Sequence, residues 1–162
     1  MKRSIAFLTI ALALAWALPV SAGEFSQPKD DVWLGGPPSE ADLDAMAEAG
    51  VGLVIDLRTT PEGIEDTERA AQERGLRYLN LPLGRELAEG ELITRVGSEL
   101  EASLASGEGV LLHCASGNRA GEVWALHRVA QGANAQQALE QAEASGTRDE
   151  RLERLRDVLE PE

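Results

Sequence analysis

The stretch "VLLHCASGNRAGEVW", residues 110–124, joins an apolar run to a polar turn and then to a segment compatible with a helix. The apolar run ends at His113, and Cys114, the only cysteine of the chain, follows it. A strand followed by a helix is the unit of α/β folds, whose ligand sites lie at the carboxyl ends of the strands. The pattern therefore predicts that Cys114 lies at the functional edge of a sheet.

The turn after Cys114 has the residues that an anion-binding loop needs. The main-chain N–H groups of residues 115–119 can curl around an anion beside a helix N-terminus, and Gly117 can supply the positive φ that such a curl requires. Arg119 can close the pocket with a two-pronged guanidinium and lower the pKa of the thiol. The predicted loop residues are Ala115, Ser116, Gly117 and Asn118. A lone cysteine leaves one alternative open, an inert thiol buried at an ordinary strand–helix turn.

Strand and helix patterns alternate along the rest of the chain. Strands are predicted at residues 31–34, 51–57, 78–83 and 110–113. Helices are predicted at 39–49, 91–106, 120–131, 134–144 and 147–159, and one more helix follows the loop after Arg58 and ends at Arg74. This alternation predicts an α/β fold with a mostly parallel central sheet of about four strands and helices on both faces. Ser39 and Asp42 form a capping-box pattern at the first helix. We expect residues 23–29 to be a loose arm, Trp124 to lie in the core and His127 to lie on the surface.

The first 22 residues have the features of a secretory signal. Lys2 and Arg3 precede an apolar run from residue 5 to 18, and small residues end at Ala22. A membrane-spanning helix needs roughly 20 apolar residues, so a cleaved signal is the favoured interpretation. We expect one domain from residue 23 to 162, in a protein that is exported and therefore periplasmic or secreted.

The formal net charge of −13 limits the partners that the surface can attract. Such a surface repels nucleic acid and anionic lipid, so we expect neither a nucleic-acid partner nor a membrane partner after signal cleavage. A small anionic substrate or phosphorylated molecule would need a site that is locally positive. The two histidines and the cysteine are too scattered to predict a metal site. The sequence leaves the oligomeric state open.

Three stretches carry a resemblance to a known family. "VLLHCASGNRAG" (110–121) resembles the anion-binding loop of the cysteine-dependent phosphatase superfamily, which includes tyrosine and dual-specificity phosphatases. "WLGGPPSEADLDAMAEAGVGLVIDLR" (33–58) and "GLRYLNLPL" (75–83) resemble one of its branches, the beta-lactamase-hydrolase-like, phosphatase-like family. The resemblance implies a single phosphatase-like domain without a cofactor, in which Cys114 is the nucleophile and Arg119 the oxyanion ligand.

The chain departs from the phosphatase pattern in the spacing of the loop and in the proton donor. Ordinary phosphatase loops place five residues between the cysteine and the arginine, whereas four stand between Cys114 and Arg119, as in the loop of rhodanese-type sulfurtransferases. No aspartate lies between Tyr78 and Cys114 to act as general acid, so the candidates for that role are Glu86 and Glu89, with Glu91 in the same region. His113, Asp56 and Arg58 are expected to support the loop. The hydroxyl residue often found after the arginine is Ala120 here.

Three functions follow from these observations. The first is a cysteine-dependent phosphatase that hydrolyses a phosphate monoester through a cysteinyl-phosphate. The second is a sulfurtransferase that carries a persulfide on Cys114. The third is a module that binds an oxyanion without turnover.

Overall fold

The computed structural model describes residues 25–161, and the predicted signal segment lies outside them. Within this range five strands form one sheet in the order β1-β2-β5-β3-β4. The strands are β1 (Phe25–Lys29), β2 (Val32–Gly35), β3 (Val51–Asp56), β4 (Arg77–Asn80) and β5 (Gly109–His113). All neighbouring pairs are parallel except β1 and β2. The predicted α/β fold with a mostly parallel sheet is confirmed.

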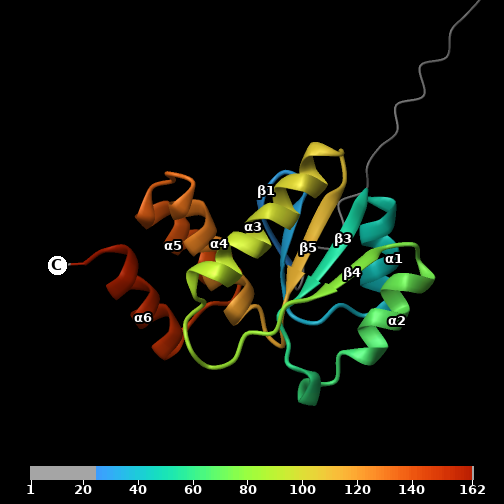
Figure 1. Cartoon of the computed structure of the whole chain (residues 1–162), viewed down its shortest axis with the longest axis horizontal. Coiled ribbons are helices and arrows are strands. Elements are labelled where there is room, and N and C mark those ends of the chain that lie inside the picture. Colours follow the sequence, from blue (N-terminus) through green and yellow to red (C-terminus); the bar gives the residue numbers. More distant parts are fainter. Residues whose placement is uncertain (1–24, 162) are drawn as a thin grey trace, which may run out of the picture.

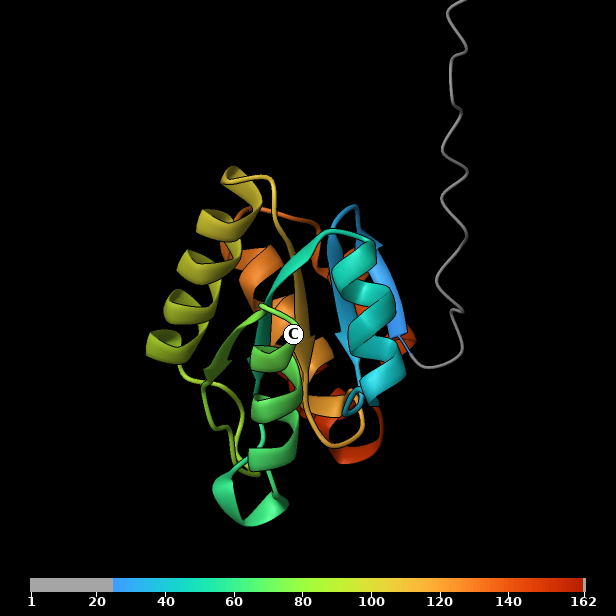
Figure 2. The same cartoon turned by 90° about the vertical axis from the view of Figure 1, so that its right-hand side faces the viewer.

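Helices cover both faces of the sheet, as Figures 1 and 2 show. The helices are α1 (Glu40–Glu48), α2 (Glu65–Glu73), α3 (Gly90–Ala105), α4 (Asn118–Ala130), α5 (Ala135–Ala144) and α6 (Asp149–Leu159), with a short 3-10 turn, η1, at Thr60–Glu62. Helices α1 and α2 pack on one face and α3 and α4 on the other, while α5 and α6 pack against α4. Among the described residues, no helix combines the length and the hydropathy that crossing a bilayer requires.

Side-chain alternation along the central strands supplies the two cores that hold these layers together. In β5, Val110 and Leu112 pack with α3 and α4, whereas Leu111 packs with α1 and α2. All three side chains have no exposed surface. Because both faces of the sheet are covered, the central strands appear in the sequence as nearly continuous apolar runs.

The strand register brings the carboxyl ends of the parallel strands to one edge. Asp56 at the end of β3 is aligned with both His113 of β5 and Asn80 of β4, and Gly35 of β2 is aligned with His113. The contact continues past the last strand residue, because the Cys114 amide donates to the Gly35 carbonyl at 3.2 Å. Cys114 therefore lies at the edge where α/β proteins place their sites.

Two expectations from the sequence are wrong. Residues 25–29 are not a loose arm but pair with β2 as a fifth strand, with Phe25 buried in the core. Pro28 concealed this strand, although proline is tolerated on an edge strand. His127 does not lie on the surface but is 8% exposed. Gly97 on α3 leaves the space for its ring, since a Cβ there would lie 2.7 Å from the His127 Nδ1.

Other details agree with the sequence or differ at the ends of elements. Trp124 is 2% exposed, as expected of a core residue. The Ser39 side chain caps α1, and Asp42 accepts the Ser39 main-chain N–H, which confirms the capping box. Strand β4 ends at Asn80 rather than at Leu83, since Pro82 interrupts the ladder. The segment still runs beside β3, because the Leu83 amide donates to the Leu57 carbonyl at 3.0 Å.

Candidate active site

The loop between β5 and α4 presents a row of main-chain donors. The N–H groups of residues 115–120 have no hydrogen-bond acceptor among the described residues. Gly117 stands at the N-cap of α4 with φ 81°, the left-handed conformation that glycine adopts without strain. Unsatisfied N–H groups at a helix N-terminus, combined with the helix dipole, can accept an anion.

The turn between α5 and α6 supports this loop from behind. A Cβ on Gly117 would clash with the Ser145 carbonyl, so the two backbones approach as closely as glycine permits. The Thr147 hydroxyl donates to the Asn118 carbonyl at 2.9 Å, and the Arg148 amide donates to Asn118 Oδ1 at 3.3 Å. Asn118 therefore faces this turn, which fixes the loop to the C-terminal helices.

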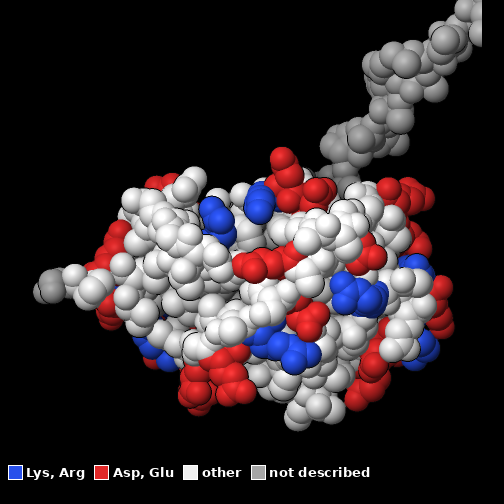
Figure 3. All heavy atoms as spheres, turned by 45° about the horizontal axis from the view of Figure 1, so that its top comes forward, with Lys and Arg blue, Asp and Glu red and all other residues white. Residues whose placement is uncertain are grey.

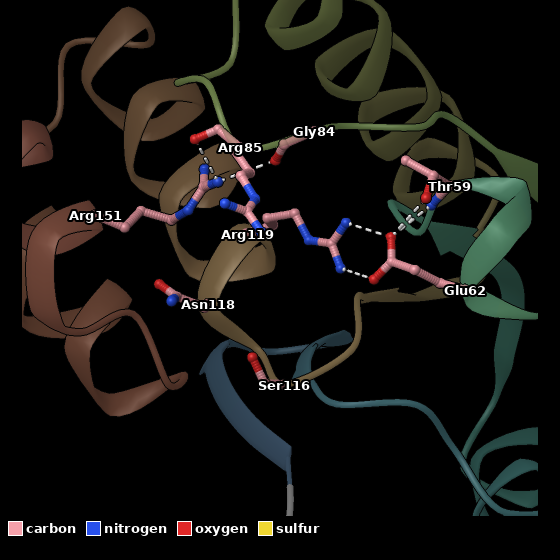
Figure 4. A pocket seen from close by; sticks show the side chains of 8 residues that line it. All are labelled: Thr59, Glu62, Gly84, Arg85, Ser116, Asn118, Arg119 and Arg151. Carbon is pink, nitrogen blue, oxygen red and sulfur yellow. Dashed lines mark hydrogen bonds and ion pairs between the residues drawn. The ribbon is translucent and has the colours of Figure 1, made fainter.

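Arg119 is held by partners from three other segments. Its Nη1 donates to Glu62 Oε2 and to the Leu83 carbonyl at 2.8 Å, and to the Leu57 carbonyl at 3.3 Å, while Nη2 donates to Glu62 Oε1 at 2.6 Å. Figure 4 shows this two-pronged contact between the guanidinium and Glu62. The Arg119 Nε has no acceptor among the described residues. The edge of the guanidinium that carries Nε can therefore still donate to a bound anion.

The ion pair with Arg119 also sets the charge of Glu62. Hydrogen bonding to Arg119, opposed by partial burial and assisted by Thr59, lowers the pKa of Glu62 to about 2. Glu62 is therefore ionised at neutral pH. The hydrogen bond to Glu62 in turn raises the pKa of Arg119, and its interaction with the Cys114 side chain adds to this rise.

Cys114 is buried at the start of the loop that carries Arg119. Its side chain packs in the apolar core on the α3 and α4 face, and the residue has no exposed surface. The sequence predicts a sulfur that faces a bound anion, but here the sulfur is covered. The guanidinium of Arg119 donates to Glu62 and to the Leu57 and Leu83 carbonyls, and it forms no hydrogen bond with the sulfur. A substrate would reach the sulfur only after the residues that cover it move.

His113, Asp56 and Arg58 form a buried network beside the loop. The Asp56 carboxylate accepts hydrogen bonds from Arg58 Nη2 and from the Tyr78 hydroxyl, both at 2.7 Å. Burial opposes ionisation of Asp56, but the hydrogen bonds from Arg58 and Tyr78, together with the neighbouring His113, outweigh it and leave the pKa of this carboxyl below its usual value. Arg58 is also bonded to Thr67 and does not line the pocket above the loop. The network therefore braces β3 and β4 below the site.

His113 is neutral at neutral pH. Its ring has no exposed surface, and its Nε2 lies 3.5 Å from Asp56 Oδ2 without forming a hydrogen bond. Burial lowers the pKa of His113 to about 4, although the Asp56 charge opposes the shift. Its Nδ1 lies 3.5 Å from the Cys114 carbonyl, which places the ring under the start of the loop.

A cavity of about 420 Å³ opens above the loop, and we refer to it as the anion pocket. Its lining residues are Thr59, Glu62, Gly84, Arg85, Ser116, Asn118, Arg119 and Arg151, drawn in Figure 4. Glu86 and Glu89 do not line it. They are exposed and border a different cavity, near the start of α3. Glu62 is thus the only carboxylate in the lining, and it is ionised.

A second buried ion pair holds the segment that overhangs the anion pocket. Arg151 on α6 contacts the carboxylate of Glu122, which has no exposed surface, and donates to the Gly84 and Arg85 carbonyls at 3.0 Å. The same Glu122 accepts the Ala88 main-chain N–H at 2.6 Å. These contacts join residues 84–88 to α4 and α6. Among the described residues, no group of His, Cys, Asp and Glu is placed to hold a metal ion.

The sequence did not indicate several of these residues. Glu62, Arg85, Glu122 and Arg151 line or support the pocket; Glu122 follows the loop in the stretch 110–124 without being assigned a role, and the other three come from segments without a recognisable motif. Glu62 lies four residues after Arg58, beyond the end of β3, and this position at the carboxyl edge was the one signal available. The other three are indistinguishable by sequence from surface charges.

Solved structures with similar folds are known phosphatases or resemble them. A candidate phosphatase (DUF442) from Shewanella putrefaciens CN-32 matches with a TM-score of 0.68 and 20% identity over 86% of this chain and 94% of its own. Tk-PTP in its active form matches with a TM-score of 0.70 and 20% identity over 85% and 97%. The human tyrosine phosphatase-like serine/threonine/tyrosine-interacting protein matches with a TM-score of 0.67 and 17% identity over 83% and 95%.

These matches show that the chain has the fold of protein-tyrosine and dual-specificity phosphatases. No family model matches the sequence, and no curated protein does. The likeness to the beta-lactamase-hydrolase-like branch stays a prediction.

The burial of Cys114, together with the ion pair that holds Arg119 of the same loop, predicts how the thiol reacts with an alkylating reagent. Glu62→Ala releases one side of Arg119, and a partly exposed ion pair is worth up to about 1 kcal/mol, so we expect alkylation by iodoacetamide to become roughly fivefold faster. Glu65→Ala removes the same charge from an exposed residue nearby and should leave the rate unchanged. An equal rate in Glu62→Ala and wild type would show that aliphatic packing alone covers the sulfur.

The buried histidines predict a loss of stability in mild acid. The unfolded His113 binds a proton below about pH 6.5 and the folded one only near pH 4, so its contribution is complete above pH 6.5 and declines as the pH falls toward 4. This lowering of the His113 pKa corresponds to roughly 3 kcal/mol of the free energy of unfolding. Urea unfolding at about pH 7 and about pH 5 should show this loss, and His113→Gln should remove most of it. His127→Gln should remove a smaller part, since burial also lowers the pKa of His127. A flat profile in the wild type would contradict the buried, neutral state of His113.

Proposed function

We propose that this protein is a cysteine-dependent phosphatase that hydrolyses phosphate monoesters through a cysteinyl-phosphate intermediate. The observation that carries the proposal is the row of N–H groups at residues 115–120, directly after Cys114, that have no acceptor among the described residues. The phosphatase fold supports it. In this mechanism the phosphoryl oxygens accept hydrogen bonds from the loop amides and from the Nε edge of Arg119. Glu62 holds the opposite edge of the guanidinium in place.

The reaction has two steps. The Cys114 thiolate attacks phosphorus, the bond from phosphorus to the ester oxygen breaks, and the leaving oxyanion takes a proton from solvent. Water then attacks the cysteinyl-phosphate, the S–P bond breaks, and inorganic phosphate leaves with the thiolate restored. Before the first step the residues that cover Cys114 must move, because the residue has no exposed surface.

The anion pocket holds no protonated carboxyl that could assist the leaving group. Glu62 is ionised, and Glu86 and Glu89 lie outside the lining. A general acid contributes about 10²–10⁴-fold to the rate, so its absence matters most for substrates with basic leaving groups. This feature supports activity toward aryl phosphates over alkyl phosphates.

Sulfur transfer is the second candidate, favoured by the four-residue spacing between Cys114 and Arg119 and by the same lack of an acid. The Cys114 thiolate would attack the sulfane sulfur of thiosulfate, break its S–S bond and release sulfite, giving a cysteine persulfide. Cyanide or a thiolate would then take the outer sulfur and restore the thiolate. Sulfite leaves as a stable anion and needs no proton donor.

Hydrolysis of 4-nitrophenyl phosphate by the purified protein tests the first proposal. We expect turnover in the wild type, none in Cys114→Ser, and a loss of about 10²–10³-fold in Arg119→Lys, which keeps the charge but not the fork. The rate should fall steeply as the leaving group becomes more basic, from 4-nitrophenol to phenol to an alkyl alcohol. Turnover that survives in Cys114→Ser would exclude the cysteinyl-phosphate.

Intact mass after thiosulfate treatment tests the second candidate. A gain of about 32 Da, one sulfur atom on a thiolate activated by its loop, would support sulfur transfer, and it should be absent from Cys114→Ser. A protein that stays unmodified by thiosulfate and hydrolyses the phosphate ester would exclude sulfur transfer and support the phosphatase proposal.

A further inference from the structure

Arginine side chains without a carboxylate partner gather at one place on this acidic protein. Within residues 25–161, every arginine has a carboxylate oxygen within 4.0 Å except Arg85, Arg128, Arg148 and Arg154. Arg128 lies over the Trp124 ring, 5.7 Å from its centre. The other three border a single cavity of about 410 Å³, which we call the arginine pocket. Figure 3 shows how widely acidic side chains are spread over one face of the molecule.

The arginine pocket adjoins the anion pocket. Arg85, Asn118 and Arg151 line both cavities, so these side chains form a common wall. Figure 4 shows Arg85 over the anion pocket, on the side of Arg151. A molecule held at the loop could therefore extend past this wall without leaving the protein surface.

The charges of the arginine pocket favour an anion. Two carboxylates, Asp149 and Glu150 in the first turn of α6, also line it and oppose anion binding. Arg151 is compensated by Glu122. The three guanidiniums of Arg85, Arg148 and Arg154 thus face two carboxylates, on a chain with a formal net charge of −13.

The donors of these arginines are largely unused. The side chains of Arg85 and Arg148 make no hydrogen bond with the described residues, and both residues are exposed. Arg154 Nη2 donates only to the Arg85 carbonyl, at 3.2 Å, and its Nε is buried without an acceptor in the described part of the chain. Planar guanidiniums with free N–H groups are well suited to phosphate, whose oxygens can accept from several of them at once.

We propose that the arginine pocket binds a second phosphate group of the substrate. The substrate is then a small molecule with two phosphates on one scaffold, one placed at Cys114 and the other among Arg85, Arg148 and Arg154. This inference deepens the proposed phosphatase function and rests on it for the chemistry at Cys114. The second phosphate supplies binding energy and selectivity, and it undergoes no reaction in the arginine pocket.

Binding to the Cys114→Ser protein tests the arginine pocket without turnover. Calorimetric titration with phenyl phosphate is compared with the 1,2-, 1,3- and 1,4-isomers of benzene bisphosphate, which add only a second phosphate at three spacings. We expect at least one isomer to bind about tenfold more tightly than phenyl phosphate, the gain typical of charged hydrogen bonds. Arg148→Gln and Arg154→Gln should each reduce this ratio severalfold. Arg156→Gln, on α6 with Arg154 but outside the lining of the arginine pocket, should not change it.

The outcomes separate this proposal from the proposed function. Isomers that all bind no better than phenyl phosphate, or a ratio that Arg148→Gln and Arg154→Gln leave unchanged, would overturn the second phosphate site. Failure of the wild type to hydrolyse 4-nitrophenyl phosphate would instead overturn the phosphatase activity, while the titrations would still decide the arginine pocket. Cys114→Ala replaces Cys114→Ser as the background if the serine variant does not fold.

Discussion

The contact of Arg119 with Glu62 and with the Leu57 and Leu83 carbonyls is the constraint on which the candidate site depends. A guanidinium that is largely buried needs acceptors for its N–H groups, because an unpaired buried charge is costly. Here the acceptors come from segments that follow β3 and β4, while the arginine itself follows β5. Only a sheet that aligns the carboxyl ends of its strands can bring these three segments together. The candidate site therefore depends on the fold.

Two further buried ion pairs stabilise the surroundings of that contact. Asp56 and Arg58 tie β3 to Tyr78 on β4, and Glu122 with Arg151 ties α4 and α6 to residues 84–88. Loss of one partner from such a pair typically costs about 3–5 kcal/mol. The segments that surround the site are therefore held in place on both sides.

The sequence predicted the parts of the molecule that local patterns encode. The apolar runs predicted four strands, and the capping box predicted the start of α1. The loop from Cys114 to Arg119 could be proposed from the sequence because its main-chain donors are consecutive in the chain. Glu62 could not be chosen among 28 acidic residues, since its partner is 57 positions away. Strand β1 and the burial of His127 were missed for the same reason, because each depends on a partner element rather than on its own pattern.

The charge state of Glu62 limits the chemistry that the pocket can perform. In a phosphatase with a protonated carboxyl, the leaving oxygen receives its proton as the bond breaks. The one carboxylate in the lining of the anion pocket, Glu62, instead forms an ion pair with Arg119, and this hydrogen bond is the main cause of its lowered pKa. The same residue cannot both hold the guanidinium and donate a proton. Under the proposed function, group transfer at Cys114 depends on leaving groups that are stable as anions, a condition that phenolates and sulfite both meet. The two proposed reactions therefore share one requirement for the leaving group, and they differ in whether the loop holds a phosphoryl group or a sulfur atom.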